Sequence, residues 1–337
     1  MRGKERLVAR VSAAAGGTRL LEALPGRPAL LVLNYHRIGD ARRAAHDAGV
    51  YSCTAAEFDR QLGHLKRRFT IVSLERALAV LAGEAPPSRP SILLTFDDGY
   101  RDNYETAFPL LRAHGATAAF FLTTGFVGAS AAPWWDAVAA IVKGSPRTRV
   151  TLDYPAAAEF DLPAGDRGAA VEAVQDHFKA GADHDPERFL SALEAACGCK
   201  RPEPGRRLFL SWDEAREMRD GGMSFGSHTR THPILAKLSY ARQLEELRQS
   251  RSVLEAELQR PAACLAYPDG QPGTYSADTQ KAAAEAGYLA AFSYIPGANL
   301  PGKSYPFDLR RYSDDSVDYD TWRLRVALRA AARPGLG

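Results

Sequence analysis

The sequence predicts an α/β protein, a distorted (β/α) barrel of about seven strands with a helical insertion. Short apolar runs, typical of strands buried on both faces of a parallel sheet, alternate along the chain with segments of helical periodicity. Roughly seven such strand and helix units in one layer favour a barrel. The alternation stops between residues 133 and 205 and then resumes, which indicates an insertion and not a second domain.

Local signals place each element in order. The first strand is a continuous apolar run, and a capping box at Thr54 and Glu57 starts the helix after it. Another capping box begins at Ser211, and Gly115 and Gly287 end helices. We expect strands at 29–35, 91–96, 117–122, 223–226, 263–267 and 289–292, and helices at 54–69, 74–81, 107–114, 211–219, 240–259 and 279–286.

Three segments lie outside this alternation. Residues 133–205 contain helical pieces at 169–179 and 187–196 and one strand-like piece at 149–152, and we interpret them as a cap on the barrel. Residues 1–27 predict a basic helical segment and residues 321–337 a basic helix, which leaves 28–320 for the barrel with its insertion. A solvated helix face and peripheral contact with a membrane both fit these basic amphipathic ends.

The composition is that of an ordinary globular protein, with 45% hydrophobic and 25% charged residues in a chain of 337. The formal net charge of +3 is spread along the chain, so nucleic acid is not an expected partner. Four cysteines form no dense framework and no CxxC motif, and we interpret them as thiols.

No apolar stretch in the sequence reaches the length of about 20 residues that a membrane-spanning helix needs. Residues 12–17 are too weakly apolar for the core of a signal peptide. We therefore expect a cytoplasmic protein, with the inner face of the membrane as the alternative location. The sequence leaves the oligomeric state open.

Two adjacent carboxylates, Asp97 and Asp98, stand where the strand 91–96 gives way to Gly99. Neighbouring side chains at a strand end point in different directions, so one carboxylate can bind a metal ion while the other transfers a proton. A turn in which Asp98 caps a helix is the alternative interpretation of the pair taken alone.

Two histidines, His228 and His232, follow the strand 223–226. With Asp98 they make the two-imidazole, one-carboxylate set of an open zinc or related divalent site. Pro233 disfavours helical geometry at His232, so we expect the pair on a turn. An ordinary surface loop is the alternative for the two histidines alone.

Polar side chains follow four of the predicted strands. They are His36, the aspartate pair, His228 and Asp269. Because the carboxyl ends of parallel strands meet at one face, the sequence predicts one site there.

The segments TFDDGY at 95–100, SHTRTH at 227–232 and AYPDG at 266–270 resemble, in this order, the motifs of the polysaccharide deacetylase family. The shared domain of that family, which is like carbohydrate esterase family 4, is also called the NodB homology domain. The resemblance covers residues 28–130 and 208–312. It implies a distorted barrel and a metal-dependent hydrolase that removes acetyl groups from N-acetylated amino sugars.

The resemblance also implies roles for single residues. Asp97 matches the general base, and Asp98, His228 and His232 match the ligands of a divalent metal, Zn²⁺ in the first place with Co²⁺, Ni²⁺ and Mn²⁺ as alternatives. The chemistry needs both parts, because an amide is a poor electrophile. A metal ion polarises its carbonyl and lowers the pKa of water from 15.7 towards about 7, and a carboxylate base adds roughly 10²–10⁴-fold in rate.

The position that supplies the general acid in many family members has no histidine in this sequence. Many members supply this acid from a histidine near the C-terminal end, in a leucine-x-histidine motif, but residues 307–312 contain no histidine. His36 lies in NYHRI at 34–38 and resembles the Tyr-His start of members that deacetylate poly-N-acetylglucosamine and take their acid from that position. We expect His36 to be the general acid, and a histidine held by a neighbouring backbone carbonyl is the alternative.

A second departure concerns the segment at 266–270. The family motif often begins with an arginine that buttresses the base, and here Ala266 takes that place. We expect Arg310 or Arg311 to orient Asp97 instead, and a backbone N–H near Asp269 to stabilise an oxyanion. Trp135 either stacks on a sugar ring or anchors the insertion. The expected substrate contacts are Asp269, Tyr267, Trp135 and Arg310.

The sequence thus predicts a metal-dependent N-deacetylase acting on an N-acetylhexosamine in a glycan, a lipid-linked sugar or a glycoside. Two alternatives stay open. One is a deformylase or another hydrolase of non-peptide C–N bonds with the same fold, and the other is an inactive carbohydrate-binding barrel.

Overall fold

The computed structural model describes residues 2–14, 16–23, 29–44, 46–84, 89–181, 185–202, 205, 207–314 and 318–331. At its centre lies one parallel sheet with the strand order β11-β10-β9-β6-β5-β1-β12, and β4 also pairs with β5. These strands are β1 (Leu30–Tyr35), β4 (Thr70–Ile71), β5 (Ser91–Asp98), β6 (Ala119–Leu122), β9 (Ser224–Ser227), β10 (Cys264–Ala266), β11 (Ala290–Phe292) and β12 (Tyr312–Ser313).

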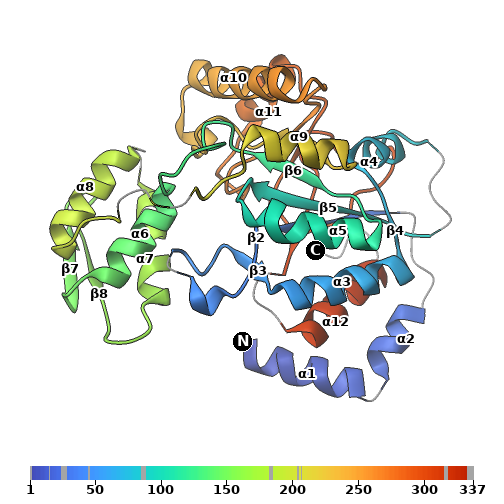
Figure 1. Cartoon of the computed structure of the whole chain (residues 1–337), viewed down its shortest axis with the longest axis horizontal. Helices are drawn as coiled ribbons and strands as arrows, with labels where there is room; N and C mark the ends of the chain where they lie inside the picture. The colour runs from blue at the N-terminus through green and yellow to red at the C-terminus, as the bar shows by residue number, and fades with distance from the viewer. Residues whose placement is uncertain are drawn as a thin grey trace.

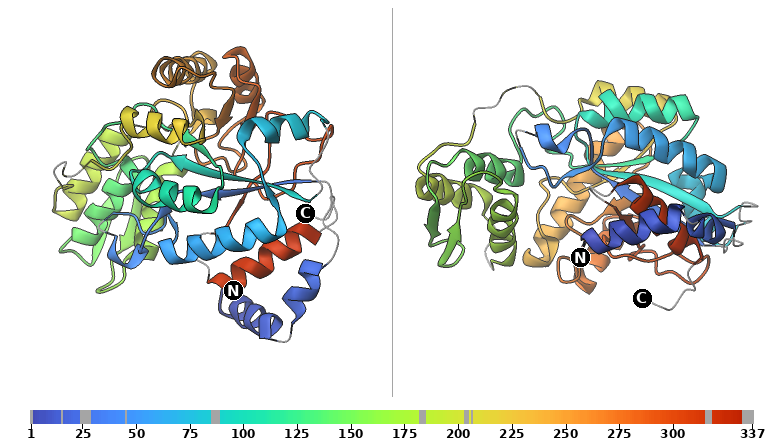
Figure 2. Two further views of the ribbon diagram at one scale, coloured as in Figure 1. Left: turned by 45° about the vertical axis from the view of Figure 1, so that its right-hand side comes forward. Right: turned by 90° about the horizontal axis from the view of Figure 1, so that it is seen from below.

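The predicted distorted barrel is confirmed. The sheet curls round, and Leu309, just before β12, forms a bridge with Phe292 of β11, so the two edges of the sheet come together (Figure 2). Successive side chains of each strand point to opposite faces. Leu93 of β5 belongs to the hydrophobic cluster inside the barrel, and Leu94 belongs to the cluster between the sheet and its outer helices.

The outer helices begin where the sequence predicts. Thr54 and Glu57 form the expected capping box, and so do Ser211 and Glu214. One difference lies at residues 103–107, where a π-helical turn (Asn103–Ala107) precedes the predicted helix. The helices are α3 (Ala55–Arg68), α4 (Leu74–Leu81), α5 (Phe108–His114), α9 (Trp212–Asp220), α10 (Tyr240–Leu258) and α11 (Ala277–Glu285).

Within the segment between β6 and β9, residues 134–197 form a separate lobe beside the barrel (Figure 1). It has its own hydrophobic cluster, with Val138, Val174, Phe178 and Phe189 at its centre. Its hairpin contains a strand, β8, that the sequence analysis missed. The elements of the lobe are α6 (Trp134–Gly144), β7 (Arg149–Leu152), β8 (Ala158–Asp161), α7 (Gly168–Ala180) and α8 (Pro186–Cys197). Residues 182–184, 203 and 204 of the predicted insertion lie outside the described residues.

The N-terminal segment consists of two helices and not one, α1 (Arg2–Ala14) and α2 (Gly17–Ala23). Both pack on the C-terminal helix α12 (Tyr319–Ala331), which in turn packs on α3 (Figures 1 and 2). Residues 24–27 and 332–337 of the predicted terminal segments lie outside the described part of the chain. Among the described helices, none is long and apolar enough to span a bilayer.

The register of the central strands sets the position of the site. Asp98 at the end of β5 is level with Leu122 of β6, and Leu122 is level with Ser227 at the end of β9. The backbone N–H of His228 donates to the Leu122 carbonyl oxygen at 2.8 Å. The ends of β5 and β9 are therefore separated by a single strand, with their polar residues at one edge.

The strands can adopt this register because residue 226 is a glycine. Replacing Gly226 therefore tests the packing of these strands. A Cβ atom there would lie 2.5 Å from the Phe121 ring and 2.8 Å from the Cys264 carbonyl oxygen. We expect Gly226→Ala to lower the free energy of unfolding by about 1–3 kcal/mol, measured by urea denaturation. Gly144→Ala is the matched control, because a Cβ at Gly144 meets no atom within 4 Å. Equal stability of the two variants would contradict this packing.

Candidate active site

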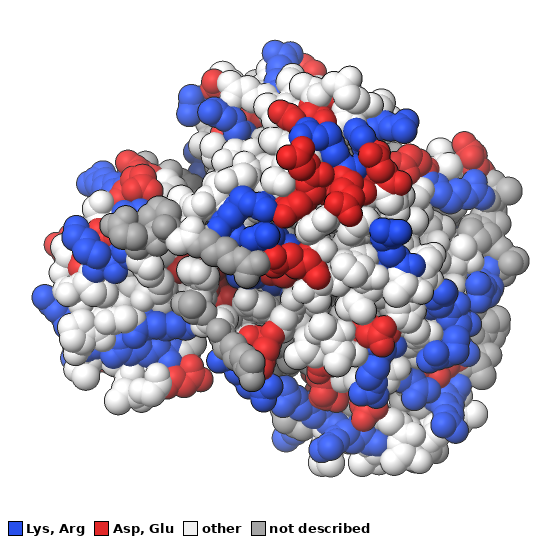
Figure 3. All heavy atoms as spheres, viewed as in Figure 1, with Lys and Arg blue, Asp and Glu red and all other residues white. Residues whose placement is uncertain are grey.

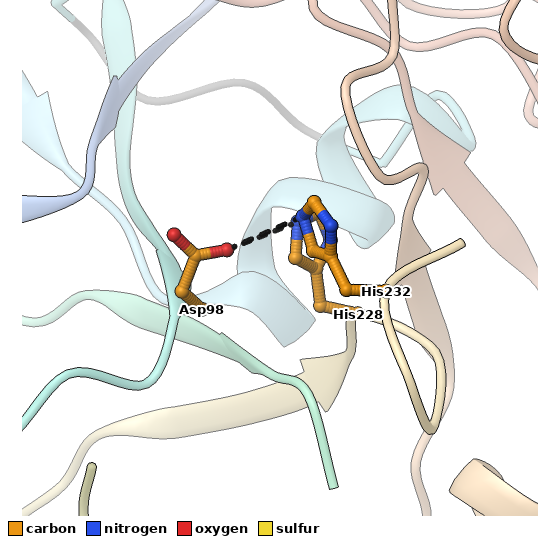
Figure 4. Close-up of side chains that lie close together, drawn as sticks. All are labelled: Asp98, His228 and His232. Carbon is orange, nitrogen blue, oxygen red and sulfur yellow. Dashed lines mark ion pairs between the residues drawn. The ribbon is translucent and has the colours of Figure 1, made fainter. Parts of the chain in front are cut away.

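Asp98, His228 and His232 come together at the carboxyl edge of the sheet (Figure 4). Their ligand atoms lie within 4.8 Å of one another. The Oδ1 atom of Asp98 is 3.5 Å from Nε2 of His228 and 3.5 Å from Nε2 of His232. The structure thus brings together the three residues that the sequence predicts as metal ligands.

The chemistry of these atoms fits a divalent cation. Asp98 Oδ1 is buried and has no hydrogen-bond donor among the described residues. Nδ1 of His228 lies 2.8 Å from the Ala266 carbonyl oxygen, which assigns the ring proton to Nδ1 and leaves the Nε2 lone pair facing Asp98. Burial lowers the pKa of His232 well below its ordinary value, so this imidazole is also neutral. One carboxylate and two imidazole lone pairs are a donor set for Zn²⁺ or a similar ion.

Two of the three residues in this cluster have backbone dihedral angles in the left-handed region. Asp98 has φ of 72°, and His232 has φ of 60°, so neither continues a strand or a helix. Non-glycine residues rarely adopt this conformation, which costs on the order of 1 kcal/mol or more where the surroundings impose it. The turn expected at His232 is present.

A glutamate that the sequence analysis missed holds this turn. Glu246 on α10 accepts hydrogen bonds from the backbone N–H groups of Arg230 and Thr231 at 3.0 and 2.9 Å, and from the Thr231 hydroxyl at 2.8 Å. The His232 N–H donates to Thr229 Oγ1 at 3.0 Å. The loop that carries both histidines is therefore bonded to a helix of the barrel.

Asp97 lies in a different environment from its neighbour. Its Oδ1 atom accepts a hydrogen bond from Arg311 Nη1 at 2.8 Å, and its Oδ2 atom accepts one from Asn34 Nδ2 at 3.1 Å. Burial alone would raise the pKa of Asp97, but the positive charge of Arg311 outweighs burial and leaves the pKa well below its usual range. Asp97 is thus a buried, ionised carboxylate.

The structure decides between the two candidate arginines. Arg311 contacts Asp97, and it also donates from Nη1 to Asn34 Oδ1 at 2.7 Å and from Nε to the Ser293 carbonyl oxygen at 2.9 Å. Arg310 instead donates to Asp308 Oδ2 at 2.8 Å and is absent from the described residues that line the cavity. The expectation that Arg310 contacts the substrate is therefore not supported by its position.

A cavity of about 200 Å³ opens over both carboxylates. His36 lines it, held in place through its backbone, since its N–H donates to Ser52 Oγ at 3.0 Å and its carbonyl accepts from Asn103 Nδ2 at 2.8 Å. The described residues around the cavity are His36, Asp47, Val50, Asp97, Asp98, Trp134, Trp135, Gln175, Lys179, His228, His232, Ile234, Tyr267, Asp269 and Tyr294.

The lobe formed by residues 134–197 contributes part of the cavity wall. Lys179 on α7 places its Nζ atom 3.4 Å from Asp269 Oδ1, and Gln175 donates to Asp47 Oδ2 at 2.8 Å. The sequence analysis did not predict either residue. The sequence of an alanine-rich helix does not indicate which of its side chains will face the carboxyl ends of strands far away in the chain. The lobe thus closes one side of the site.

Trp135 lines the cavity, but it is buried. Its indole N–H donates to the Tyr100 hydroxyl at 2.7 Å, and its ring centroid lies 4.5 Å from that of His232. Of the two alternatives for Trp135, these contacts favour an anchor that supports a metal ligand over an exposed aromatic side chain.

The remaining predicted contacts also lie at the cavity. Tyr267 donates from its hydroxyl to the Phe307 carbonyl oxygen at 3.0 Å and stacks on Tyr275, so only one side of it faces the cavity. Asp269 has φ of 60°, and the N–H of Gly270 is bonded to the Pro268 carbonyl oxygen at 2.7 Å. The N–H of Asp269 itself is the one that remains as a candidate oxyanion donor.

The motifs and their geometry agree with a comparison against known families. The family model for polysaccharide deacetylases matches residues 84–159 and 166–291. The chain belongs to the polysaccharide deacetylase family. The match includes the aspartate pair, both histidines and Asp269, whereas His36 and Arg311 lie outside it.

Solved structures share the fold of this chain. IcaB from Ammonifex degensii is 22% identical with a TM-score of 0.57, over 90% of this chain and 97% of that one. The deacetylase PplD of Streptococcus pyogenes is 20% identical with a TM-score of 0.57, over 87% and 96%. At these identities the likeness shows the fold.

A curated relative, YxkH of Bacillus subtilis, is named for the same family. It is 22% identical over 224 residues, which are 66% of this chain and 52% of YxkH. The chain therefore spans about half the length of this polysaccharide deacetylase relative.

The pairing of Arg311 with Asp97 predicts a pH dependence. The pKa of Asp97 is lower in the folded protein than in the unfolded chain, where it is about 3.9. The ion pair therefore stabilises the fold at a pH above about 3.9, and this stabilisation is lost as the pH falls through the pKa of Asp97 in the folded protein. In the Arg311→Met variant, burial still raises the pKa of Asp97, but the positive charge that lowers this pKa is gone. We expect the acidic limb of the kcat/KM profile to move to higher pH, and Arg311→Lys to move it less.

Arg310→Met is the matched control, because Arg310 makes no contact with Asp97, and its profile should equal that of the wild type. Removing one partner of a buried pair also lowers stability by about 3–5 kcal/mol, so circular dichroism must show that each variant is folded. An unshifted acidic limb in folded Arg311→Met and Arg311→Lys would contradict the assignment.

Proposed function

We propose that this protein hydrolyses the N-acetyl amide of an N-acetylhexosamine carried in a glycan, a lipid-linked sugar or a glycoside. The observation that carries the proposal is the division between two adjacent carboxylates. Asp97 is bound by Arg311 and Asn34, while Asp98 faces the Nε2 atoms of His228 and His232. A base and a metal ligand are thus placed side by side in one cavity.

Asp98, His228 and His232 are the residues that hold the divalent ion in this proposal. The ion supplies a Lewis acid that polarises the amide carbonyl and lowers the pKa of water. Nitrogen and oxygen donors of this kind suit Zn²⁺ first, and Co²⁺, Ni²⁺ and Mn²⁺ as alternatives.

Asp97 acts as the general base. Its lowered pKa keeps it ionised, so it is able to accept a proton from water throughout the neutral range. The hydrogen bonds from Arg311 and Asn34 orient the carboxylate, and they hold it away from the metal ligands. The positive charge of Arg311 also offsets the cost of a buried anion next to Asp98.

His36 acts as the general acid that protonates the departing amine. Three histidines are among the described residues that line the cavity, and two of them, His228 and His232, belong to the metal site. His36 is the remaining histidine of that set, and histidine is the side chain most often used for general acid catalysis. Its backbone is bonded to Ser52 and Asn103, which fixes the position from which the ring reaches the cavity.

The substrate contacts in this proposal are Tyr267 and Asp269, both on the cavity wall. The backbone N–H of Asp269 serves as the oxyanion donor, a contribution of about 10²–10³ in rate where such donors have been removed.

The test is release of acetate from monomeric, oligomeric and lipid-linked N-acetylhexosamines, with N-formyl analogues in parallel. We expect acetate, and we expect Asp97→Asn to lower kcat by roughly 10²–10⁴-fold while stoichiometric metal is retained. Asp98→Asn is the contrasting variant and should lose the metal.

Three outcomes would refute parts of this proposal. An unchanged rate in Asp97→Asn would exclude Asp97 as the base. Formate without acetate would make the protein a deformylase. No product from any substrate, with the metal fully bound, would indicate an inactive carbohydrate-binding barrel.

A further inference from the structure

Exposed apolar side chains gather on the terminal helices. In the described part of the chain, eight large hydrophobic side chains are exposed, and five of them lie on α1, α2 and α12. Single exposed apolar residues are ordinary on soluble proteins, but a group on adjacent helices indicates an interaction surface. The five are Leu7, Val8, Val11, Leu20 and Leu328.

The orientation of α1 is fixed, and it directs the apolar side chains outward. Ala9 is fully buried, and Glu5 accepts two hydrogen bonds from Arg325 on α12, at 2.8 and 2.9 Å. Leu7 and Val11 are one helical turn apart and lie on the side of the helix opposite Ala9. They are 64% and 59% exposed. A helix of a soluble protein normally buries its apolar side and exposes the other.

The helix α2 is held in the same way. Glu22 accepts two hydrogen bonds of 2.6 Å from Arg323 on α12, and Thr18 is fully buried. Leu20 points outward and is 73% exposed. Because α12 lies between these two helices and α3, α1 and α2 form an outer layer of the molecule (Figures 1 and 2).

The charges on this layer have one sign. Both acidic residues of α1 and α2, Glu5 and Glu22, are neutralised by arginines of α12. Figure 3 shows blue and white atoms along the lower edge of the molecule, where α1 and α2 lie in Figure 1. Among the side chains of the two helices that the structure describes, the exposed charged ones are all basic: Lys4, Arg6, Arg10 and Arg19, of which Arg6 also pairs with Asp318 at 3.5 Å. Apolar side chains flanked by basic ones are the pattern of helices that lie in the interface of anionic bilayers.

We propose that the outer face of α1 and α2 binds an anionic lipid surface, with Leu7, Val11 and Leu20 in the headgroup region and the basic residues on the lipid phosphates. This inference is independent of the proposed function. The charge favours an anionic lipid surface as the occupant, because the exposed charged side chains described on both helices are basic and lie beside exposed leucine and valine side chains.

The test is cosedimentation of the full chain with vesicles of phosphatidylcholine, alone or mixed three to one with phosphatidylglycerol. We expect binding to the anionic vesicles, weakened by high salt. Leu7→Glu with Val11→Glu should abolish the binding. Lys4→Gln and Arg10→Gln should each weaken it about fivefold, the value for one basic residue at such a surface.

Leu289→Glu is the matched control, since Leu289 is 66% exposed and lies outside the terminal helices. This variant should bind vesicles like the wild type, and all variants should keep the wild-type metal content and melting temperature. Absence of binding to anionic vesicles would overturn the proposal, and so would equal binding by Leu7→Glu with Val11→Glu. A dimer in sedimentation velocity that the same double substitution dissociates would assign the face to a second copy and also overturn it.

Discussion

The buried ion pair between Asp97 and Arg311 is the interaction on which the rest of the site depends. Both side chains are almost completely excluded from solvent, and removing two charges from water costs several kcal/mol per ion unless other bonds compensate. Asn34 and the Ser293 carbonyl oxygen supply such bonds. The pair joins β5 to the segment just before β12, and Asn34 adds β1, so one cluster ties the strand of the base to the closing edge of the barrel.

The positions of the proposed metal ligands follow from this arrangement and from the strand register. Because Arg311 binds Asp97, the adjacent Asp98 is left to face the histidines, and the left-handed backbone at Asp98 turns it away from its neighbour. His228 arrives from β9, one strand beyond β6, and His232 follows on a turn held by Glu246. Two carboxylates of equal intrinsic acidity thus acquire different roles from their surroundings.

The sequence predicted the barrel and the ligands because their signals are local. Apolar runs mark strands buried on both faces, and residues at strand ends share one edge of a parallel sheet. Contacts between residues that are far apart in the sequence could not be predicted from these local signals. Arg310 and Arg311 are neighbours whose side chains point in opposite directions, and only the register of the last strand decides which one meets Asp97. Asn34 and Glu246 look like ordinary polar residues until the fold places them, and the burial of Trp135 depends on how the lobe docks.

The assignment of the metal to Asp98, and not to Asp97, is tested most directly by X-ray diffraction from crystals of the zinc-loaded protein at the zinc absorption edge. We expect one anomalous peak shared by the Asp98 carboxylate and Nε2 of both His228 and His232, with Asp97 still bonded to Arg311 and outside the coordination sphere. A peak coordinated by Asp97, or zinc bound away from these histidines, would contradict it.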